Sequence, residues 1–204
     1  MNWNIVKGAC LALLPVAGTL KAQEKPNIVV ILADDLASNE ISCYGGKNLK
    51  TPNIDRIAEE GIRFTNNFAS CAMSVPIRAS LYTGLYPARH GSYQNHKISY
   101  SDIKSVTYYL PQAGYRVGRA GKTHTVPKSV FNFEKVPGFE ENCIAVTADY
   151  TVDGIRDFMR QDSPFCLFVC STLSHAPWTC GNKDEFDADK VILPPNCVDN
   201  KGTR

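Results

Sequence analysis

Four short segments of the chain carry side chains whose types and spacing suit chemistry. In the first, Asp34 and Asp35 directly follow an apolar run. Two adjacent carboxylates repel each other unless a cation or hydrogen-bond donors compensate their charge, and a hard divalent ion with oxygen ligands is the natural compensator. The pair therefore indicates either a metal site or an ordinary turn in which an aspartate caps the next element.

The second segment contains a candidate nucleophile, Ser74, followed by a cation, Arg78. Pro76 suits the first turn of a helix, so Ser74 is expected in the positive field of a helix N-terminus, which favours an anionic substrate. Arg78 can reach back to hold the nucleophile or the anion. The alternative is an ordinary N-capping serine beside an exposed arginine.

The third and fourth segments supply a lysine and two histidines. Lys122 and His124 alternate across one residue at the end of an expected strand, so both point to the same face if the strand continues. A lysine supplies positive charge to an oxyanion, and a histidine can act as acid, base or hydrogen-bond donor. His175, in the stretch SHAPW, again follows an apolar run. Taken singly, each of these residues is also consistent with an ordinary surface or loop side chain.

The apolar patterns predict the elements that must position these segments. Asn27–Ala33 (NIVVILA) is a continuous β-branched run, which is typical of a strand buried on both faces of a parallel sheet. Further strands are predicted at 62–68, 115–120 and 165–170, and helices at 51–61, 77–83, 105–113 (where Pro111 should kink or end the helix) and 148–161. The alternation favours an α/β fold with a mainly parallel sheet flanked by helices. Such sheets bind ligands at the carboxyl ends of their strands, where the polar segments stand.

Length and composition narrow the class of protein. The 204 residues are 44% apolar and 21% charged, which excludes a disordered or collagen-like chain. A formal net charge of +2 gives no electrostatic case for a nucleic-acid partner.

Residues 1–22 have the basic start, short apolar run and small final residue of a secretory signal peptide. Because this run is too short to cross a membrane, we expect no stable membrane insertion. The signal peptide predicts export to a periplasmic, secreted or lysosome-like compartment.

In this order, the four segments resemble the type I sulfatase family of the alkaline phosphatase superfamily. KPNIVVILADDL resembles the family's first strand with its paired aspartates, and CAMSVPIRASLYTG resembles its signature, a Cys or Ser followed by x-Pro-x-Arg and a later Thr-Gly. TPNIDRIAEEGIRFTNNF resembles the segment leading to that signature, GYRVGRAGKTH the second signature, and SHAPW the later histidine. The resemblance runs from about residue 25 to the end of the chain and implies an alkaline phosphatase-like fold.

The resemblance implies a role for each matching residue. Asp34 and Asp35, with Ser74, would bind a divalent metal, usually Ca²⁺. Ser74 would be oxidised after translation to formylglycine by a maturation enzyme, and Arg78 would steady it. Cys71 is a competing nucleophile, but no proline stands two residues after it, so Ser74 keeps the assignment.

Lys122, His124 and His175 resemble the family's sulfate-binding and acid–base residues. His175 would protonate the leaving group and His124 would assist breakdown of the sulfated intermediate, although the sequence leaves these two roles exchangeable. The implied reaction is hydrolysis of a sulfated glycan, an aryl ester or another sulfate ester. Within the third segment, GKTHTVPKSVFNF resembles the sulfamidases that cleave N-sulfoglucosamine, in the branch that acts on glycosaminoglycans.

Family members are usually much longer than this chain, and their remaining metal ligands lie beyond the point that matches Arg204. We therefore expect residues 23–204 to be the N-terminal portion of a sulfatase catalytic domain, with little or no activity alone. Two other hypotheses stay open at this point. One is a non-catalytic remnant or binding module, and the other is a phosphonate or phosphodiester hydrolase of the same superfamily.

Overall fold

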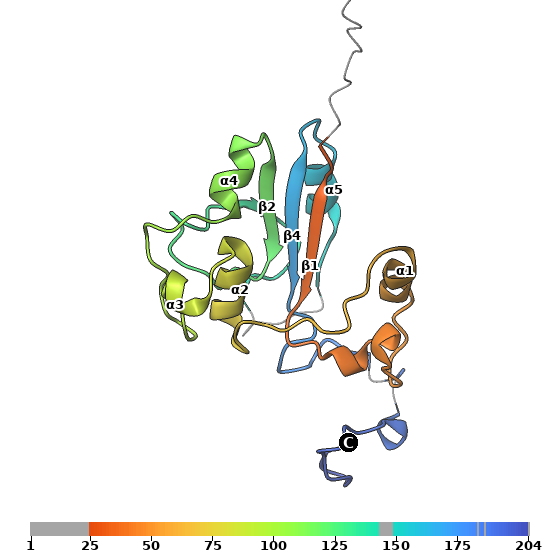
Figure 1. Ribbon diagram of the computed structural model, residues 1–204. Coiled ribbons are helices and arrows are strands. Elements are labelled where there is room, and N and C mark those ends of the chain that lie inside the picture. The colour runs from red at the N-terminus through yellow and green to blue at the C-terminus, as the bar shows by residue number, and fades with distance from the viewer. Residues whose placement is uncertain (1–24, 143–148, 183, 186, 204) are drawn as a thin grey trace, which may run out of the picture.

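A parallel sheet forms the centre of the described fold (Figure 1). The computed structural model describes residues 25–142, 149–182, 184–185 and 187–203, and the signal peptide expected at residues 1–22 lies outside them. The described strands are β1 (Ile28–Ala33), β2 (Arg116–Gly121), β3 (Glu134–Val136) and β4 (Phe165–Ser171), in the order β1-β4-β2-β3. Neighbouring strands run parallel, which confirms the predicted α/β fold with a mainly parallel sheet.

The strand β4 lies between β1 and β2, and its composition suits that place. Its side chains are buried from Phe165 to Cys170, because this apolar run can be covered on both faces. Ile28 of β1 and Val117 of β2 both pair with Cys166, so the three strands share one register. The carboxyl ends of these strands consequently lie together at one edge of the sheet.

Helices cover both faces of the sheet. To one side lie α2 (Ser74–Thr83), α3 (Pro87–His90) and α4 (Val106–Gln112), and to the other lies α5 (Asp153–Met159) (Figure 1). Tyr82 of α2 packs edge to face on Phe168 of β4, with ring centroids 5.1 Å apart. Phe158 of α5 packs on Phe165 with centroids 5.8 Å apart. Burying each such side chain stabilises the fold by about 1.5–3 kcal/mol, which is enough to hold each helix on its face.

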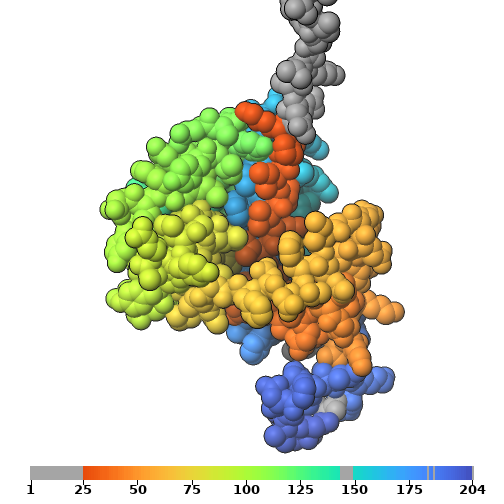
Figure 2. Space-filling view, in the orientation of Figure 1, coloured from red at the N-terminus to blue at the C-terminus, as the bar shows by residue number. Residues whose placement is uncertain are grey.

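The remaining helical segments are short. The helix α1 (Pro52–Glu60) begins after Thr51 and ends before Gly61, as predicted. The Thr51 hydroxyl donates to the Asp55 carboxylate at 3.1 Å instead of accepting a helix N–H. Single 3₁₀ turns occur at η1 (Ser38–Glu40), η2 (Ser42–Tyr44) and η3 (Ala188–Lys190). The final residues, coloured dark blue, project away from the sheet beyond its carboxyl edge (Figure 2).

Two strand predictions are wrong. Residues 62–68 pair with no strand in the described part of the chain, and Phe64 and Phe68 are exposed. The strand β1 forms where expected but is not buried on both faces, since Val29 and Ile31 are 47% and 68% exposed. The strand β1 lies at the edge of the described sheet. The helix α5 packs against β2, β3 and β4, so it does not cover β1.

Helix boundaries differ from the prediction at α2 and α5. The helix α2 begins at Ser74, so that Pro76 lies in its first turn. The helix α5 covers only part of the predicted range 148–161, of which residue 148 lies outside the described part. As predicted, Pro111 stands close to the end of α4. Among the described residues, no helix combines the length and the apolar character needed to cross a membrane.

Gly121 ends β2 and directs the chain into Lys122. Its φ is +78°, and a Cβ at this position would overlap the carbonyl oxygen of Cys170. The backbone N–H of Lys122 donates to that same carbonyl at 3.0 Å. Gly84, after α2, also has a positive φ of +70°, but a Cβ there would meet no atom within 4 Å. The two glycines therefore share a backbone conformation and differ in crowding.

We expect Gly121→Ala to lower the free energy of unfolding by at least about 3 kcal/mol, because left-handed backbone strain adds to a steric overlap. Gly84→Ala should cost only about 1 kcal/mol, since strain acts there alone. Urea unfolding of the two variants measures the difference. Equal losses would show that crowding against Cys170 does not restrict this turn.

Candidate active site

The carboxyl edge of the sheet brings the four segments into one cleft. The strand β1 runs into the aspartate pair, β2 runs into the Lys122 loop, β4 runs into the His175 loop, and α2 begins here. The cleft has a volume of about 660 Å³ and is lined by five of the predicted residues, Asp35, Ser74, Lys122, His124 and His175. The other two predicted residues, Asp34 and Arg78, are 6% and 3% exposed and bond to members of this set.

Asp34 is the buried centre of the arrangement. One carboxylate oxygen accepts a hydrogen bond from Nη2 of Arg78 at 3.1 Å, and the other accepts one from Nζ of Lys122, which is 1% exposed. Burial by itself would raise the pKa of Asp34. The hydrogen bond from Lys122 and the charges of Arg78 and Lys122 outweigh burial, so this pKa lies below its usual value. The carboxylate is therefore held in its ionised form.

Ser74 stands at the N-terminus of α2, as predicted. Nε of Arg78, one turn further along the helix, lies 3.4 Å from Oγ of Ser74. The side-chain oxygen of Asn95 accepts a hydrogen bond from the backbone N–H of Val75 at 3.0 Å. This bond holds the Asn95 loop against the start of α2. Among the described residues, Nη1 of Arg78 is buried and has no hydrogen-bond partner. A buried cation thus lies beside the serine.

His175 is oriented by its own loop. Nδ1 lies 2.6 Å from the carbonyl oxygen of Ala176, which can only accept, so Nδ1 carries a proton. Nε2 points toward the aspartate pair and lies 3.4 Å from Oδ2 of Asp35 and 3.9 Å from Oδ2 of Asp34. The Ser174 hydroxyl fixes the same loop by donating to the Asp34 carbonyl at 2.7 Å. His175 therefore presents Nε2 to the acidic side of the site.

His124 faces a second histidine that sequence reasoning missed. The ring centroids of His96 and His124 are 5.9 Å apart, and both residues have positive φ, +65° and +41°. Burial lowers the pKa of His124, and the charges of Lys122 and Arg78 lower it further, so its neutral ring is favoured. His96 and Asn95 stand in a loop with no apolar periodicity, so the sequence pattern holds no signal for them.

A buried histidine joins α2 to α3. His90 is fully buried, and its Nδ1 accepts a hydrogen bond from the backbone N–H of Ser92 at 3.1 Å. Nε2 therefore carries the proton of the neutral ring, and it lies 3.1 Å from Oγ of Ser80. Burial lowers the pKa of His90 and favours this neutral form. Because Ser80 belongs to α2, the contact orients the helix that carries Ser74.

The oxygen donors around Asp34 fit only part of a calcium site. Ca²⁺ takes about six to eight oxygen ligands, whereas the predicted set consists of Asp34, Asp35 and Ser74. Both carboxylate oxygens of Asp34 are engaged by Arg78 and Lys122. Within the described ranges, no group of three or more His, Cys, Asp or Glu side chains could hold a metal ion. The described residues do not complete such a site, and Ca²⁺ binding stays a prediction.

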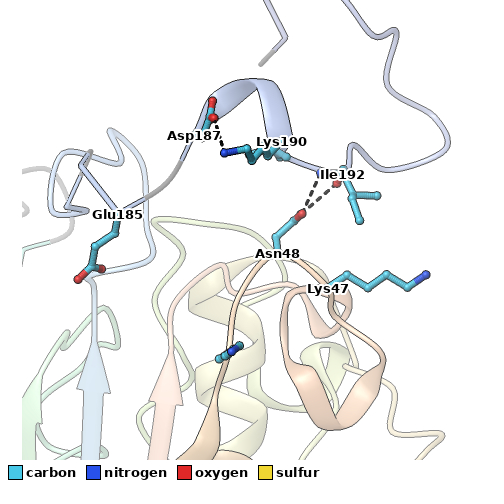
Figure 3. A pocket seen from close by; sticks show the side chains of 8 residues that line it. Lys47, Asn48, Glu185, Asp187, Lys190 and Ile192 are labelled. Carbon is cyan, nitrogen blue, oxygen red and sulfur yellow. Dashed lines mark hydrogen bonds and ion pairs between the residues drawn. The ribbon is translucent and has the colours of Figure 1, made fainter.

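A second hollow of about 610 Å³ shares no lining residue with the cleft (Figure 3). Its main feature is a clamp by Asn48, which donates to the carbonyl of Ile192 at 3.0 Å and accepts from its N–H at 2.8 Å. Lys190 pairs with Asp187 at 3.0 Å, and both side chains are exposed. The two bonds from Asn48 fasten Ile192 to the loop around residue 48, and none of the predicted site residues takes part.

Comparison with known proteins identifies the family. Residues 26–190 match the sulfatase family, which is most of the chain. The chain therefore belongs to the sulfatase family. The match spans the aspartate pair, the Ser74 segment, the Lys122 loop and His175, which are the four segments that meet in the cleft.

Curated relatives include sulfatases that carry the names of glycan substrates. The chain is 38% identical to an ulvan-active sulfatase of Formosa agariphila, 32% identical to an N-acetylglucosamine-6-O-sulfatase of Bacteroides thetaiotaomicron and 34% identical to human N-sulphoglucosamine sulphohydrolase. These alignments cover 76%, 83% and 85% of this chain but 31%, 34% and 36% of the relatives. The chain thus spans about a third of the length of these three relatives.

Solved structures share the fold. A protein in complex with its substrate D-glucosamine-2-N,6-O-disulfate is 31% identical, with a TM-score of 0.63 over 76% of this chain and 36% of that chain. A phosphonate monoester hydrolase of Agrobacterium radiobacter is 24% identical, with a TM-score of 0.58 over 72% of this chain and 40% of that one, and shows the fold alone. The predicted alkaline phosphatase-like fold is confirmed.

We expect Asp34→Asn to lower the free energy of unfolding by about 3–5 kcal/mol, because two buried cations lose their anionic partner. Asp35→Asn is the matched control. The Asp35 side chain is 64% exposed, and its replacement should cost less than about 1 kcal/mol. Denaturant unfolding of both variants without added metal tests this difference. Losses of similar size would contradict a central role for Asp34.

Proposed function

We propose that the protein hydrolyses the sulfate group of a sulfated glycan or another sulfate ester. One observation carries the proposal: Ser74 stands at the N-terminus of α2 beside Arg78, in the cleft that Lys122, His124 and His175 also line. A helix N-terminus with neighbouring cations favours a tetrahedral oxyanion. The two histidines supply groups for the proton transfers that ester cleavage requires.

The proposal includes oxidation of Ser74 to formylglycine by a maturation enzyme. A serine hydroxyl is a poor nucleophile toward a sulfate monoester, whereas an aldehyde hydrate carries two hydroxyl groups on one carbon. One hydroxyl loses its proton to the surrounding water, and its oxygen attacks sulfur while the bond from sulfur to the substrate oxygen or nitrogen breaks and the leaving atom takes up a proton. The second hydroxyl then gives its proton to a base, the bond from carbon to the sulfated oxygen breaks to release sulfate, and the aldehyde forms again. Addition of water to the aldehyde restores the hydrate. Arg78 steadies the hydrate, and Lys122 supplies charge to the sulfate oxygens.

The surroundings of the two histidines favour different roles for them. Nδ1–H of His175 is bound to its own loop, so in the doubly protonated ring Nε2–H is the group that would give a proton to the leaving oxygen or nitrogen. His124 has a lowered pKa and a neutral ring, which suits acceptance of the proton from the second hydroxyl of the hydrate. We therefore propose His175 as the acid and His124 as the base.

The names of the relatives support a carbohydrate substrate. Those names include ulvan, N-acetylglucosamine 6-sulfate and N-sulfoglucosamine chemistry. Together with the resemblance of GKTHTVPKSVFNF to sulfamidases, they make a glycosaminoglycan sugar the first substrate to test. We further propose Ca²⁺ at Asp34 and Asp35, with ligands additional to the described set. Export to a periplasmic, secreted or lysosome-like compartment follows from the signal-like residues 1–22.

We expect co-expression with a formylglycine-generating enzyme to remove two hydrogen atoms from the peptide that contains Ser74, as read by mass spectrometry. Ser74→Ala should lack this change, and any sulfate release that the modified protein shows should fall to the background level, because the nucleophile is absent. Cys71→Ala is the matched control. Cys71 does not line the cleft, so this variant should keep both the modification and the activity.

A substrate comparison separates sulfate hydrolysis from the two other candidate functions. Faster release of sulfate from N-sulfoglucosamine or glucosamine 6-sulfate than of alcohol from an aryl phosphonate supports the proposal. Faster phosphonate hydrolysis would favour a phosphonate or phosphodiester hydrolase and overturn it. Tight binding of sulfated sugars without any sulfate release would identify a binding module. An unmodified Ser74 in active protein would exclude the formylglycine step.

A further inference from the structure

A smaller hollow adjoins the catalytic cleft. It has a volume of about 290 Å³ and shares two lining residues with the cleft, Thr123 and Glu141, so the two hollows are neighbours. Its lining includes Arg119 of β2 and Lys128 from the loop that follows. None of the seven predicted site residues lines it. The hollow is therefore a separate space beside the predicted site residues.

Arg119 holds its guanidinium group in this hollow with most of its donors uncommitted. Cζ lies 4.6 Å from the ring centroid of the buried Phe133, which supports the cation through its π face. Among the described residues, Arg119 donates only through Nη1, to the Thr123 carbonyl and the Thr125 hydroxyl, both at 3.4 Å. A guanidinium carries five N–H donors in a planar fork, so an anion can still be bound through two of them.

The charges around the hollow leave an excess of positive charge. Its acidic residues Glu134 and Glu141 each form an ion pair with a basic neighbour, at 2.6 Å and 2.5 Å. In the described ranges, by contrast, Arg119 and Lys128 form an ion pair with no carboxylate. An anion that enters the hollow therefore meets two cations whose charge is not compensated.

We propose that the hollow is a second anion subsite, in which Arg119 and Lys128 bind a sulfate or carboxylate group on the sugar next to the one that loses its sulfate. This inference rests on the proposed function, because it assigns the neighbouring space of the same cleft. Arginine binds both of these anions through paired hydrogen bonds. The preferred substrate is then an oligosaccharide with at least two anionic groups, and a monosulfated monosaccharide fills only part of the site.

Calorimetric titration of the full chain, with calcium present, tests the subsite. The probes are N-sulfoglucosamine alone, and disaccharides in which the same sugar is joined to a uronic acid or to a sulfated neutral sugar. Wild-type protein should bind the charged disaccharides about tenfold more tightly than the monosaccharide, as charge-assisted hydrogen bonds permit. The two disaccharides distinguish carboxylate from sulfate as the second anion.

Arg119→Gln and Lys128→Gln should each remove most of the disaccharide advantage and leave the affinity for the monosaccharide within about twofold. Arg160→Gln removes a positive charge from an exposed side chain after α5 and is the matched control, which should keep the full advantage. Arg119 also donates to the Thr123 carbonyl next to Lys122, whereas Lys128 has no such bond among the described residues. The Lys128 variant therefore checks that the effect does not come from a disturbed loop.

Equal binding of the monosaccharide and the disaccharides by wild-type protein would overturn the subsite. So would an equal loss of affinity for all probes in both variants, because that result would mean a general disturbance of the cleft. A retained disaccharide preference in a protein that releases no sulfate would support the subsite without supporting hydrolysis. Failure of this inference and failure of the proposed function are thus distinguishable.

Discussion

The burial of the Asp34 carboxylate between Arg78 and Lys122 is the interaction on which the rest of the site depends. Asp34 follows β1, Lys122 follows β2, and Arg78 belongs to α2, so one anion joins two strands separated by β4 to the helix that carries Ser74. Removing these charges from water costs several kcal/mol per ion, and close partners must offset that cost. The position of the Ser74 segment therefore depends on the order of the strands in the sheet.

The same charges give the two cleft histidines different properties. His124 lies near Lys122 and Arg78, which lower its pKa beyond the effect of burial. His175 lies on the opposite, acidic side, with one ring nitrogen bound to its own backbone. One residue type is thus placed in two electrostatic environments, beside cations at His124 and beside carboxylates at His175.

The sequence predicts the parallel sheet, and the edge at which the site residues gather, because both depend on local apolar runs. The apolar run of β4 defines a buried strand, and polar residues that follow such strands must share an edge. The 62–68 segment is misjudged because a short apolar run does not reveal whether a neighbouring strand exists. Asn95 and His96 reach the cleft through a loop without periodicity. Whether Asp34 meets cations or a metal depends on side-chain distances that no spacing in the sequence specifies.

Two buried nitrogen atoms at this edge, Nη1 of Arg78 and Nδ1 of His124, have no hydrogen-bond partner among the described residues. Each such atom lowers the stability of the fold by about 1–3 kcal/mol. Their hydration is lost when the chain folds, before any ligand arrives. No protein group in the described ranges replaces that water at either atom, so the fold itself bears the cost of leaving the two nitrogens unpaired. The anion site that we propose at this edge is in this sense prepared by folding, and it needs no large net positive charge on the protein.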